Sequence, residues 1–177
     1  MYQPAEDSYF FKEFLENFFK DKKLKKSFSV LDMGSGEGIL AETCSKFVNK
    51  KNILCADIQK ESVLLLRKKG FKAVQSDLFK NIKRKFDLII FNAPYLPLDK
   101  REDRESRIET TGGLRGDEIS LRFLKEAKKR LKKNGKIFLL ISSLTPIKRI
   151  KKFKPKLVAR KKIWFEELKI LEFENED

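Results

Sequence analysis

Apolar residues along the chain follow two alternating patterns. Short apolar runs alternate with longer segments in which apolar residues recur three and four positions apart. The runs predict buried strands, and the spaced segments predict helices that pack on them. Strands are expected at residues 28–33, 52–57, Phe71–Gln75, 86–91 and 137–141. Alternation of strand and helix is typical of an α/β fold with a parallel sheet.

Several helices are expected between these strands. A phenylalanine-rich helix begins near Asp7 or Ser8, either of which can cap its first turn. Another is capped by Asp117, carries apolar residues at helical spacing, and stops at Asn134-Gly135. A short basic helix begins at Thr145-Pro146.

The last part of the chain predicts a hairpin. Residues 157–165 and 168–173 are two strands joined by a tight turn at Glu166-Glu167, an antiparallel pair at one end of the sheet. We therefore expect a Rossmann-like, doubly wound α/β fold with seven mostly parallel strands and helices on both faces. No repeat or linker divides the chain, so residues 1–177 are expected to form a single domain. Residues 1–27 would pack on it as an N-terminal lid and helix.

Composition and charge narrow the class of protein. The 177 residues include 41 Lys and Arg against 26 Asp and Glu, a formal charge of +15, and no histidine. The absence of histidine excludes a Ser/His/Asp triad and a histidine-containing zinc site. The positive charge favours proximity to RNA, DNA or the ribosome, although a Lys- and Glu-rich surface also suits a heat-adapted protein.

The sequence shows no signal for membrane insertion or secretion and contains only two cysteines. No apolar run reaches the length of a transmembrane helix, and the first residues do not resemble a signal peptide. Cys44 and Cys55 have no metal-like spacing. We expect a cytoplasmic protein with two reduced thiols, no metal and no membrane contact.

The strongest chemical signal lies at the end of the first strand. The stretch Val30-Leu31-Asp32-Met33-Gly34-Ser35-Gly36-Glu37-Gly38 is the strand, glycine turn and helix start of a nucleotide site. Gly34 and Gly36 let the backbone approach a ligand without a Cβ in the way. A dinucleotide fingerprint needs its third glycine where Ile39 stands. Asp32 would repel a pyrophosphate and attract the ammonium group of a methionine moiety, which favours S-adenosylmethionine over another nucleotide or an ordinary glycine turn.

Acidic residues also follow the next two strands. Asp57 ends the second strand, where a carboxylate can accept from ribose hydroxyls or cap a helix. Asp77 follows the third strand and can accept from an adenine amino group, with Leu78 offering its amide or apolar side to the ring; an ordinary turn acid is the alternative. The carboxyl ends of parallel strands share one edge, so these residues are expected near Asp32.

The fourth strand ends in Asn92-Ala93-Pro94-Tyr95. A planar nitrogen with two N–H groups can be aimed at a methyl donor when acceptors hold both groups. The side-chain oxygen of Asn92 and the backbone carbonyl of Ala93 can be these acceptors, because Pro94 keeps Ala93 extended. Tyr95 can stack on the flat acceptor. The increase in methylation rate would come from positioning and needs no strong base, which suits a chain without histidine. The alternative interpretation is a plain Asn-x-Pro turn that ends the strand.

A long polar segment, Leu96–Gly116, follows this motif. It has no clear periodicity and holds several arginines and the pair Gly112-Gly113. A loop of this length in a small domain is usually a functional lid or disordered.

Three motifs resemble one family. Asn92-Ala93-Pro94-Tyr95 resembles the N-[P/A]-P-Y motif of amino-group methyltransferases, which DNA adenine and some ribosomal RNA guanine enzymes share. The opening Tyr2-Gln3-Pro4-Ala5-Glu6-Asp7-Ser8 resembles that of the archaeal and eukaryotic HemK-type protein-glutamine N5-methyltransferases. The segment Gly112-Gly113-Leu114-Arg115-Gly116 resembles the Gly-Gly segment of the same branch, and the resemblance covers nearly the whole chain in order.

The resemblance implies a class I S-adenosylmethionine-dependent methyltransferase. Its acceptor would be the glutamine amide in the Gly-Gly-Gln loop of class I peptide release factors. Asn92, the Ala93 carbonyl, Pro94 and Tyr95 would hold the acceptor. Contacts to S-adenosylmethionine, or closure of its site, would come from Ser8, Asp32, Gly34, Gly36, Asp57, Asp77, Leu78 and Asn92.

The resemblance also implies a partner. Members of this branch often need a small zinc-binding activator subunit that adds to the sheet edge at the third strand, here Phe71–Gln75. Two alternatives to the glutamine reaction stay open. One is N-methylation of an adenine or guanine amino group in RNA or DNA, and the other is a non-catalytic subunit that binds S-adenosylmethionine.

Overall fold

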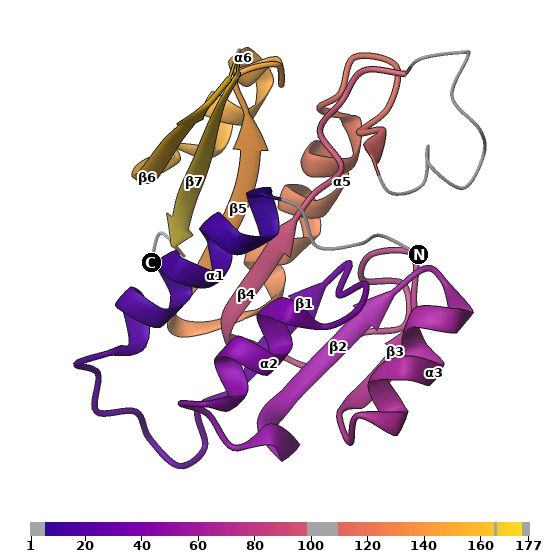
Figure 1. Cartoon of the computed structure of the whole chain (residues 1–177), viewed down its shortest axis with the longest axis vertical. Coiled ribbons are helices and arrows are strands. Elements are labelled where there is room, and N and C mark those ends of the chain that lie inside the picture. The colour runs from indigo at the N-terminus through magenta and orange to yellow at the C-terminus, as the bar shows by residue number, and fades with distance from the viewer. Residues whose placement is uncertain (1–5, 99–109, 165, 175–177) are drawn as a thin grey trace.

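Seven strands form one sheet in the order β3-β2-β1-β4-β5-β7-β6, within the parts of the chain that the structure describes (Figure 1). The structure is a computed structural model that describes residues 6–98, 110–164 and 166–174. The first five strands run parallel, and β7 lies antiparallel to both β5 and β6. The predicted seven-stranded sheet with a C-terminal antiparallel pair is confirmed. The strands are β1 (Val30–Met33), β2 (Ile53–Asp57), β3 (Lys72–Gln75), β4 (Phe86–Asn92), β5 (Leu131–Ser142), β6 (Lys156–Ile163) and β7 (Glu166–Glu174).

Helices cover both faces of this sheet, with α1 and α2 in front of it and α5 behind it in the view of Figure 1. Short 3-10 turns, η1 (Lys50–Asn52), η2 (Lys128–Arg130) and η3 (Lys151–Phe153), connect several elements. The helices are α1 (Glu6–Phe19), α2 (Ile39–Ser45), α3 (Lys60–Lys68), α5 (Glu118–Ala127) and α6 (Ile147–Ile150). None of the described helices is long and apolar enough to cross a membrane.

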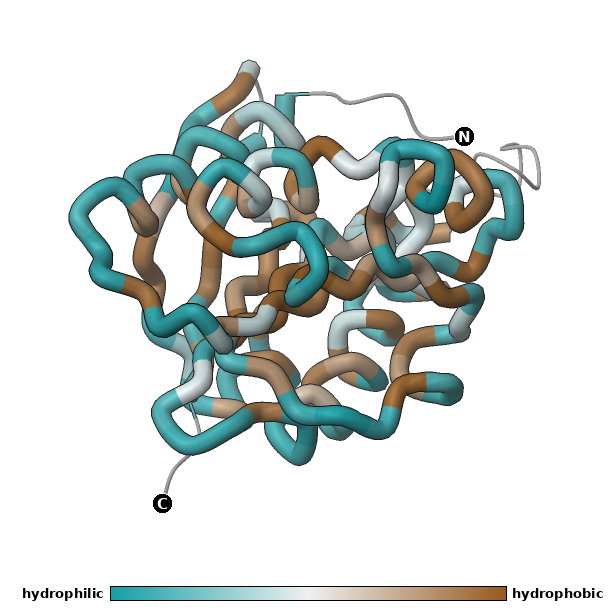
Figure 2. Tube along the Cα trace, turned by 90° about the horizontal axis from the view of Figure 1, so that it is seen from below, coloured by the Kyte–Doolittle hydropathy of each residue, from teal (hydrophilic) through white to brown (hydrophobic). Residues whose placement is uncertain are grey.

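Two apolar cores lie on opposite faces of the sheet, because successive side chains of a strand point in opposite directions. Along β4, Leu88 and Ile90 pack with the α1, α2 and α3 side, whereas Ile89 and Phe91 pack with the α5 and α6 side. All four side chains are 3% exposed or less. The hydropathy colouring of Figure 2 accordingly places hydrophobic segments inside and hydrophilic loops outside. Burial on both faces explains why the central strand is an uninterrupted apolar run.

The helix predicted to extend from Asp117 to Asn134-Gly135 is shorter than expected. Helix α5 ends at Ala127, a 3-10 turn follows, and Leu131 begins β5 by pairing with Phe86. Leu131 fits helical spacing, but its pairing with β4 and its burial against the sheet decide its conformation. Asn134 and Gly135 lie in an irregular part of β5, before Lys136 pairs with Leu88.

The predicted helix caps are also wrong in detail. Asp117 occupies the N-cap position of α5, as predicted, but its side chain makes no cap bond. Its fully buried carboxylate instead accepts from Arg149, with the Nε–Oδ2 pair at 2.8 Å. Asp7 and Ser8 lie inside α1, in its first turn, rather than before it. Both positions are explained by long-range partners, which local propensity does not include.

The C-terminal turn lies before Glu166-Glu167, the two residues predicted to form it. Glu166 pairs with Ile163 and Glu167 pairs with Lys162, so both acids belong to β7 and the turn precedes them. Residue 165, the opening residues 1–5 and residues 99–109 of the predicted Leu96–Gly116 loop lie outside the described residues. Cys44 and Cys55 are buried free thiols, as predicted.

Candidate active site

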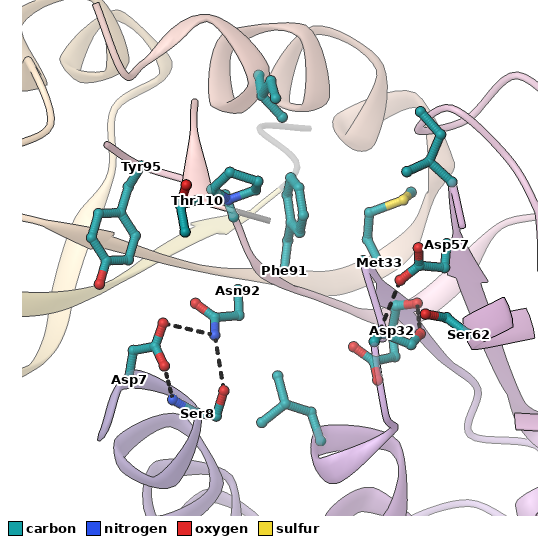
Figure 3. Close-up of a pocket in the computed structure, with 18 of the residues that line it drawn as sticks. Asp7, Ser8, Asp32, Met33, Asp57, Ser62, Phe91, Asn92, Tyr95 and Thr110 are labelled. Carbon is teal, nitrogen blue, oxygen red and sulfur yellow. Dashed lines mark hydrogen bonds between the residues drawn. The ribbon is translucent and has the colours of Figure 1, made fainter. Parts of the chain in front are cut away.

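A cavity of about 630 Å³ opens at the carboxyl ends of β1, β2 and β4, which is where open α/β sheets bind ligands. Figure 3 shows the side chains that the strand ends, the α1 N-terminus and the Thr110 region contribute to it. Its volume is that of a small-molecule site. The cavity brings together Ser8, Asp32, Gly34, Gly36, Asp57, Asp77, Leu78 and the whole segment Asn92–Tyr95, which are the residues singled out in the sequence.

The glycine turn after β1 forms part of the cavity wall. Gly34, Gly36 and Gly38 all have positive φ, at 61°, 52° and 92°, which the left-handed region allows readily only for glycine. A Cβ on Gly36 would meet nothing within 4 Å, whereas one on Gly38 would lie 2.6 Å from Leu66. The glycines therefore serve two purposes: Gly36 keeps space open for a ligand, and Gly38 lets α2 pack against α3.

Asp32 is a buried carboxylate without a hydrogen-bond partner. It is 1% exposed, and neither of its oxygens has a partner among the described residues. Burial raises the pKa of Asp32 to about 8, and the charge of Asp57 acts in the same direction. Such a group is costly in the ligand-free protein and is well suited to a cationic ligand group.

Asp57 holds the end of the glycine turn in place. Its Oδ2 accepts from the Gly36 backbone N–H at 2.8 Å, and its Oδ1 accepts from the Gln59 backbone N–H at 2.8 Å. The side chain is 8% exposed and lines the cavity. Each carboxylate oxygen can accept more than one hydrogen bond, so this anchoring is compatible with binding of ligand hydroxyls.

Asp77 and Leu78 form another part of the wall. Asp77 accepts from Arg122 of α5 at 2.8 Å, an ion pair that the sequence did not suggest. Leu78 is 8% exposed with a φ of 49°, so its backbone makes a sharp turn beside the cavity. The two residues combine an apolar surface with a hydrogen-bond acceptor, as recognition of a flat ring requires.

The side-chain amide of Asn92 is held from one side. Its Nδ2 donates to Asp7 Oδ2 and to Ser8 Oγ, both at 3.2 Å, and Figure 3 shows the two bonds coming from the start of α1. A carboxylate only accepts hydrogen bonds, so Asp7 fixes which end of the amide faces it. The Asn92 oxygen therefore points away from α1, on the side of Tyr95.

The backbone after Asn92 is packed against the glycine segment. A Cβ on Gly112 would lie 2.6 Å from the Pro94 carbonyl oxygen and would also collide with the Gly116 backbone. A Cβ on Gly116 would lie 2.6 Å from the Tyr95 carbonyl oxygen. These contacts give the predicted Gly112–Gly116 segment a physical reason: its glycines let two backbone segments touch and fix the conformation of the Asn92–Tyr95 loop.

The two ends of the Leu96–Gly116 loop are joined by backbone hydrogen bonds. The Leu96 N–H donates to the Thr110 carbonyl and the Gly112 N–H donates to the Leu96 carbonyl, each at 2.9 Å. Thr110 and Thr111 line the cavity, although no motif had marked them. Their place follows from pairing across a loop, which a linear pattern does not report.

The cavity wall is acidic in a basic protein. Among its described residues seven side chains are acidic, and Arg122 is the single basic one. The pKa of Tyr95 is raised by burial and by the charges of two of these acids, Asp7 and Glu166. Glu166 and Trp164, from the β6–β7 hairpin, also line the cavity and were not predicted, since a hairpin turn has no catalytic signature.

Comparison with known proteins identifies the family. The family described as methyltransferase small domain matches residues 12–165. A Methanocaldococcus jannaschii protein named "Putative protein N5-glutamine methyltransferase" is 38% identical over 185 residues, which cover 97% of this chain and 90% of that protein. The chain belongs to the methyltransferase small domain family. It is an S-adenosylmethionine-dependent N-methyltransferase, and its resemblance to the glutamine methyltransferases is confirmed.

Other relatives of this methyltransferase carry two substrate names. A Streptococcus pneumoniae protein named release factor glutamine methyltransferase is 33% identical over 137 residues, covering 68% of this chain and 48% of that protein. A Francisella tularensis protein named ribosomal protein uL3 glutamine methyltransferase is 31% identical over 124 residues, covering 60% of this chain and 39% of that protein. The chain thus spans about half or less of these two relatives.

Solved structures share the fold of this methyltransferase. The ribosomal protein L11 methylase of Lactobacillus delbrueckii subsp. bulgaricus aligns with a TM-score of 0.68 at 18% identity, covering 98% of this chain and 81% of that chain. The T. thermophilus 16S rRNA N2 G1207 methyltransferase, in complex with AdoMet and guanosine, aligns with a TM-score of 0.66 at 20% identity, covering 98% of this chain and 44% of that chain.

The cavity of this methyltransferase fits S-adenosylmethionine. The unpartnered carboxylate of Asp32 suits the ammonium group of the methionine moiety, and the open space at Gly36 accommodates a ligand beside the turn. Asp57 and Asp77 offer further acceptors along the same edge. Over the described residues no cluster of three or more potential metal ligands occurs.

Proposed function

We propose that this methyltransferase modifies a protein glutamine: the side-chain amide in the Gly-Gly-Gln loop of a class I peptide release factor. The names of the relatives support glutamine as the acceptor. The observation that carries the proposal is the amide of Asn92, whose nitrogen is held by Asp7 and Ser8 while its oxygen is turned toward the Tyr95 side. A second glutamine substrate, a ribosomal protein, is an outcome of the test below.

The chemistry is an in-line transfer of a methyl group to a planar nitrogen. When bound, S-adenosylmethionine supplies an electrophilic methyl group on a sulfonium. The Asn92 oxygen and the Ala93 carbonyl accept the two N–H groups of the acceptor amide and aim its nitrogen, while Pro94 keeps Ala93 extended. Tyr95 stacks on the amide plane. The methylated nitrogen is acidic and loses its proton without a strong base, so positioning supplies most of the rate gain.

The proposed cofactor residues follow from the cavity wall. Asp32 receives the ammonium group, Asp57 the ribose hydroxyls, and Asp77 with Leu78 the adenine ring. Gly34 and Gly36 leave room for the methionine moiety, and Ser8 closes the site above Asn92. With Arg122 engaged by Asp77, this end of the cavity has a net negative charge that attracts a sulfonium and an ammonium group.

The charge around the acceptor favours a protein over a nucleic acid. Glu6, Asp7 and Glu166 line the cavity, and the charges of Asp7 and Glu166 act on Tyr95. Arg122, which pairs with Asp77, is the single basic residue among the described lining residues. A phosphate backbone brought to this wall would be repelled, whereas an uncharged amide on a protein loop would not. The overall charge of +15 favours the nucleic-acid alternative, but the basic residues responsible for it lie outside this cavity, except for Arg122, among the described residues.

The remaining expectations stay predictions. Strand β3 lies at one edge of the sheet and, among the strands that the structure describes, pairs only with β2. Its outer side can therefore accept an added strand from an activator subunit. A single domain over residues 1–177, a place near the ribosome and a cytoplasmic location are consistent with this proposal.

A transfer assay with tritiated S-adenosylmethionine tests the proposal. The protein is incubated separately with the class I release factor of its own organism, with ribosomal proteins and with total RNA, each with and without a candidate activator. Label on the release factor that disappears when its Gly-Gly-Gln glutamine is changed supports the proposal. Label on RNA alone, or on a ribosomal protein alone, overturns the release factor assignment. Binding of S-adenosylmethionine without transfer to any acceptor would indicate a non-catalytic subunit.

A further inference from the structure

Trp164 is the most exposed large apolar residue among those described. It is 91% exposed, and it is the single tryptophan of the chain. It follows the last residue of β6 and lines the mouth of the cavity together with Ile163 and Glu166. A tryptophan in this setting leaves a large aromatic surface in water and contributes little to the stability of the folded chain.

The backbone of Trp164 adds a second unfavourable feature. Its φ is 42°, in the left-handed region that turns normally fill with glycine or asparagine. A bulky residue there is strained, and at 91% exposure its side chain recovers little by packing. The tight β6–β7 turn explains the positive φ, but stability does not explain why a tryptophan occupies this position with its side chain exposed. An interaction outside this chain is the better explanation.

The topology places Trp164 beside the acceptor end of the site. Because β7 runs antiparallel to β5, the start of β7 lies beside the end of β5, where Ser142 pairs with Leu168, and β4 ends on the same side. The Ser142 hydroxyl donates to Glu166 at 2.5 Å and ties the hairpin to β5 at this edge. Glu166 in turn lies close enough to Tyr95 to raise the pKa of the phenol.

We propose that Trp164 is a docking surface for the protein loop that presents the acceptor amide. The indole would pack on the loop's backbone outside the cavity while the amide enters between Asn92 and Tyr95. This inference rests on the proposed function and adds the recognition element to it. The occupant is a protein loop because Glu166 and Asp7 border the same mouth and disfavour phosphate groups. A flat, rigid side chain gives large contact area at low entropy cost, which is why tryptophan is common at binding hot spots.

The test uses Trp164→Asn, since asparagine tolerates positive φ. The variant is expected to melt at the same temperature as the wild type or higher, and to bind S-adenosylmethionine with unchanged affinity. Its KM for the release factor should rise by about tenfold or more, as for loss of a hot-spot aromatic residue. Trp164→Phe should recover most of that loss. The control Leu157→Ala removes an exposed apolar side chain (48% exposed) from the other end of β6. It should change neither the affinity for S-adenosylmethionine nor the KM for the release factor.

A spectroscopic measurement gives a readout besides turnover. Incorporating 5-fluorotryptophan gives this chain a single fluorine signal, and the unlabelled release factor is silent. The signal should move on addition of the release factor and stay unchanged on addition of S-adenosylmethionine alone.

The outcomes separate the two proposals. If the wild-type enzyme does not methylate a release factor, the proposed function fails. If it does, and the KM of Trp164→Asn stays within twofold of the wild type, docking on Trp164 is refuted. A lower melting temperature or weaker S-adenosylmethionine binding in Trp164→Asn also refutes it, because the residue would then be structural or part of the cofactor site.

Discussion

Replacing Asp32 with asparagine should stabilise the ligand-free enzyme at neutral pH and weaken its binding of S-adenosylmethionine. The carboxyl is 1% exposed and has no hydrogen-bond partner among the described residues, and burial raises its pKa from 3.8 to about 8. A folded pKa above the unfolded pKa means that unfolding releases a proton. Stability therefore falls as the pH rises from about 4 to about 8.

The magnitude follows from the shift in pKa. One pKa unit corresponds to about 1.4 kcal/mol. At pH 7, about three units above the unfolded pKa, the buried Asp32 therefore lowers the free energy of unfolding by on the order of 4 kcal/mol relative to strongly acidic pH. Between pH 5 and pH 8 the wild type should lose roughly 3 to 4 kcal/mol of unfolding free energy. Asp32→Asn keeps the shape of the side chain and cannot ionise, so its stability should be flat over this range.

The chain is favourable for this measurement because it contains no histidine, the usual source of pH dependence between pH 5 and pH 8. Among the described residues, the other carboxyls with a shifted pKa have lowered values and titrate below this range; they are Glu16, Asp87 and Glu174. Urea unfolding of both proteins at pH 5, 6, 7 and 8 gives the free energies directly.

Two results would refute the reasoning. If wild type and Asp32→Asn change equally between pH 5 and pH 8, Asp32 is not a buried group that ionises in this range. If calorimetry finds equal S-adenosylmethionine affinities at pH 8, the carboxylate does not receive the ammonium group. Saturating S-adenosylmethionine should also remove most of the pH dependence of the wild type, because a bound cation stabilises the ionised carboxylate.

Three further substitutions test the acceptor side. Asn92→Ala should lower kcat by about a hundredfold or more, as for loss of one positioned transition-state group, with a much smaller effect on S-adenosylmethionine binding measured by calorimetry. Asp7→Asn should lower kcat, because an amide at position 7 can pair with either the nitrogen or the oxygen of the Asn92 side chain and no longer fixes its orientation. An unchanged kcat would show that Asp7 does not orient Asn92. Gly112→Ala should cost about 1 to 3 kcal/mol and reduce kcat by pushing on the Pro94 carbonyl. Its control, Gly70→Ala, adds a Cβ at a φ of 81° with no atom nearer than 3.9 Å, and should leave kcat unchanged.

Most of the strand-end residues could be predicted because a parallel sheet converts linear order into a spatial row. Once four apolar runs are recognised as strands, the residues that end them must meet at one edge. This is how Asp32, Asp57, Asp77 and Asn92 come to line one cavity. The glycine turn was recognisable for a related reason: positive φ at Gly34 and Gly36 restricts the residue type directly.

Long-range partners account for what the sequence did not predict. Asp117 is a residue type that commonly caps helices, yet its carboxylate accepts a hydrogen bond from Arg149, 32 positions away. Leu131 has helical spacing, yet its pairing with Phe86 makes it the start of a strand. Local propensity contributes less free energy than one buried ion pair or one sheet contact, so tertiary contacts determine the conformation at these positions.

The opposite signs of the surface and the cavity have one physical explanation. A chain with a formal charge of +15 attracts polyanions over distances up to about the Debye length, roughly 8 Å at physiological ionic strength. The acidic residues at the cavity mouth act at contact distance, where they determine which group enters. A protein substrate that works beside RNA meets both conditions: its surroundings are drawn to the basic surface, and its neutral amide is accepted by the acidic site. A phosphate group brought close to Glu166 and Asp7 together with a nucleic-acid base would be repelled by these two acids. The two charge distributions together therefore favour a protein amide as the acceptor.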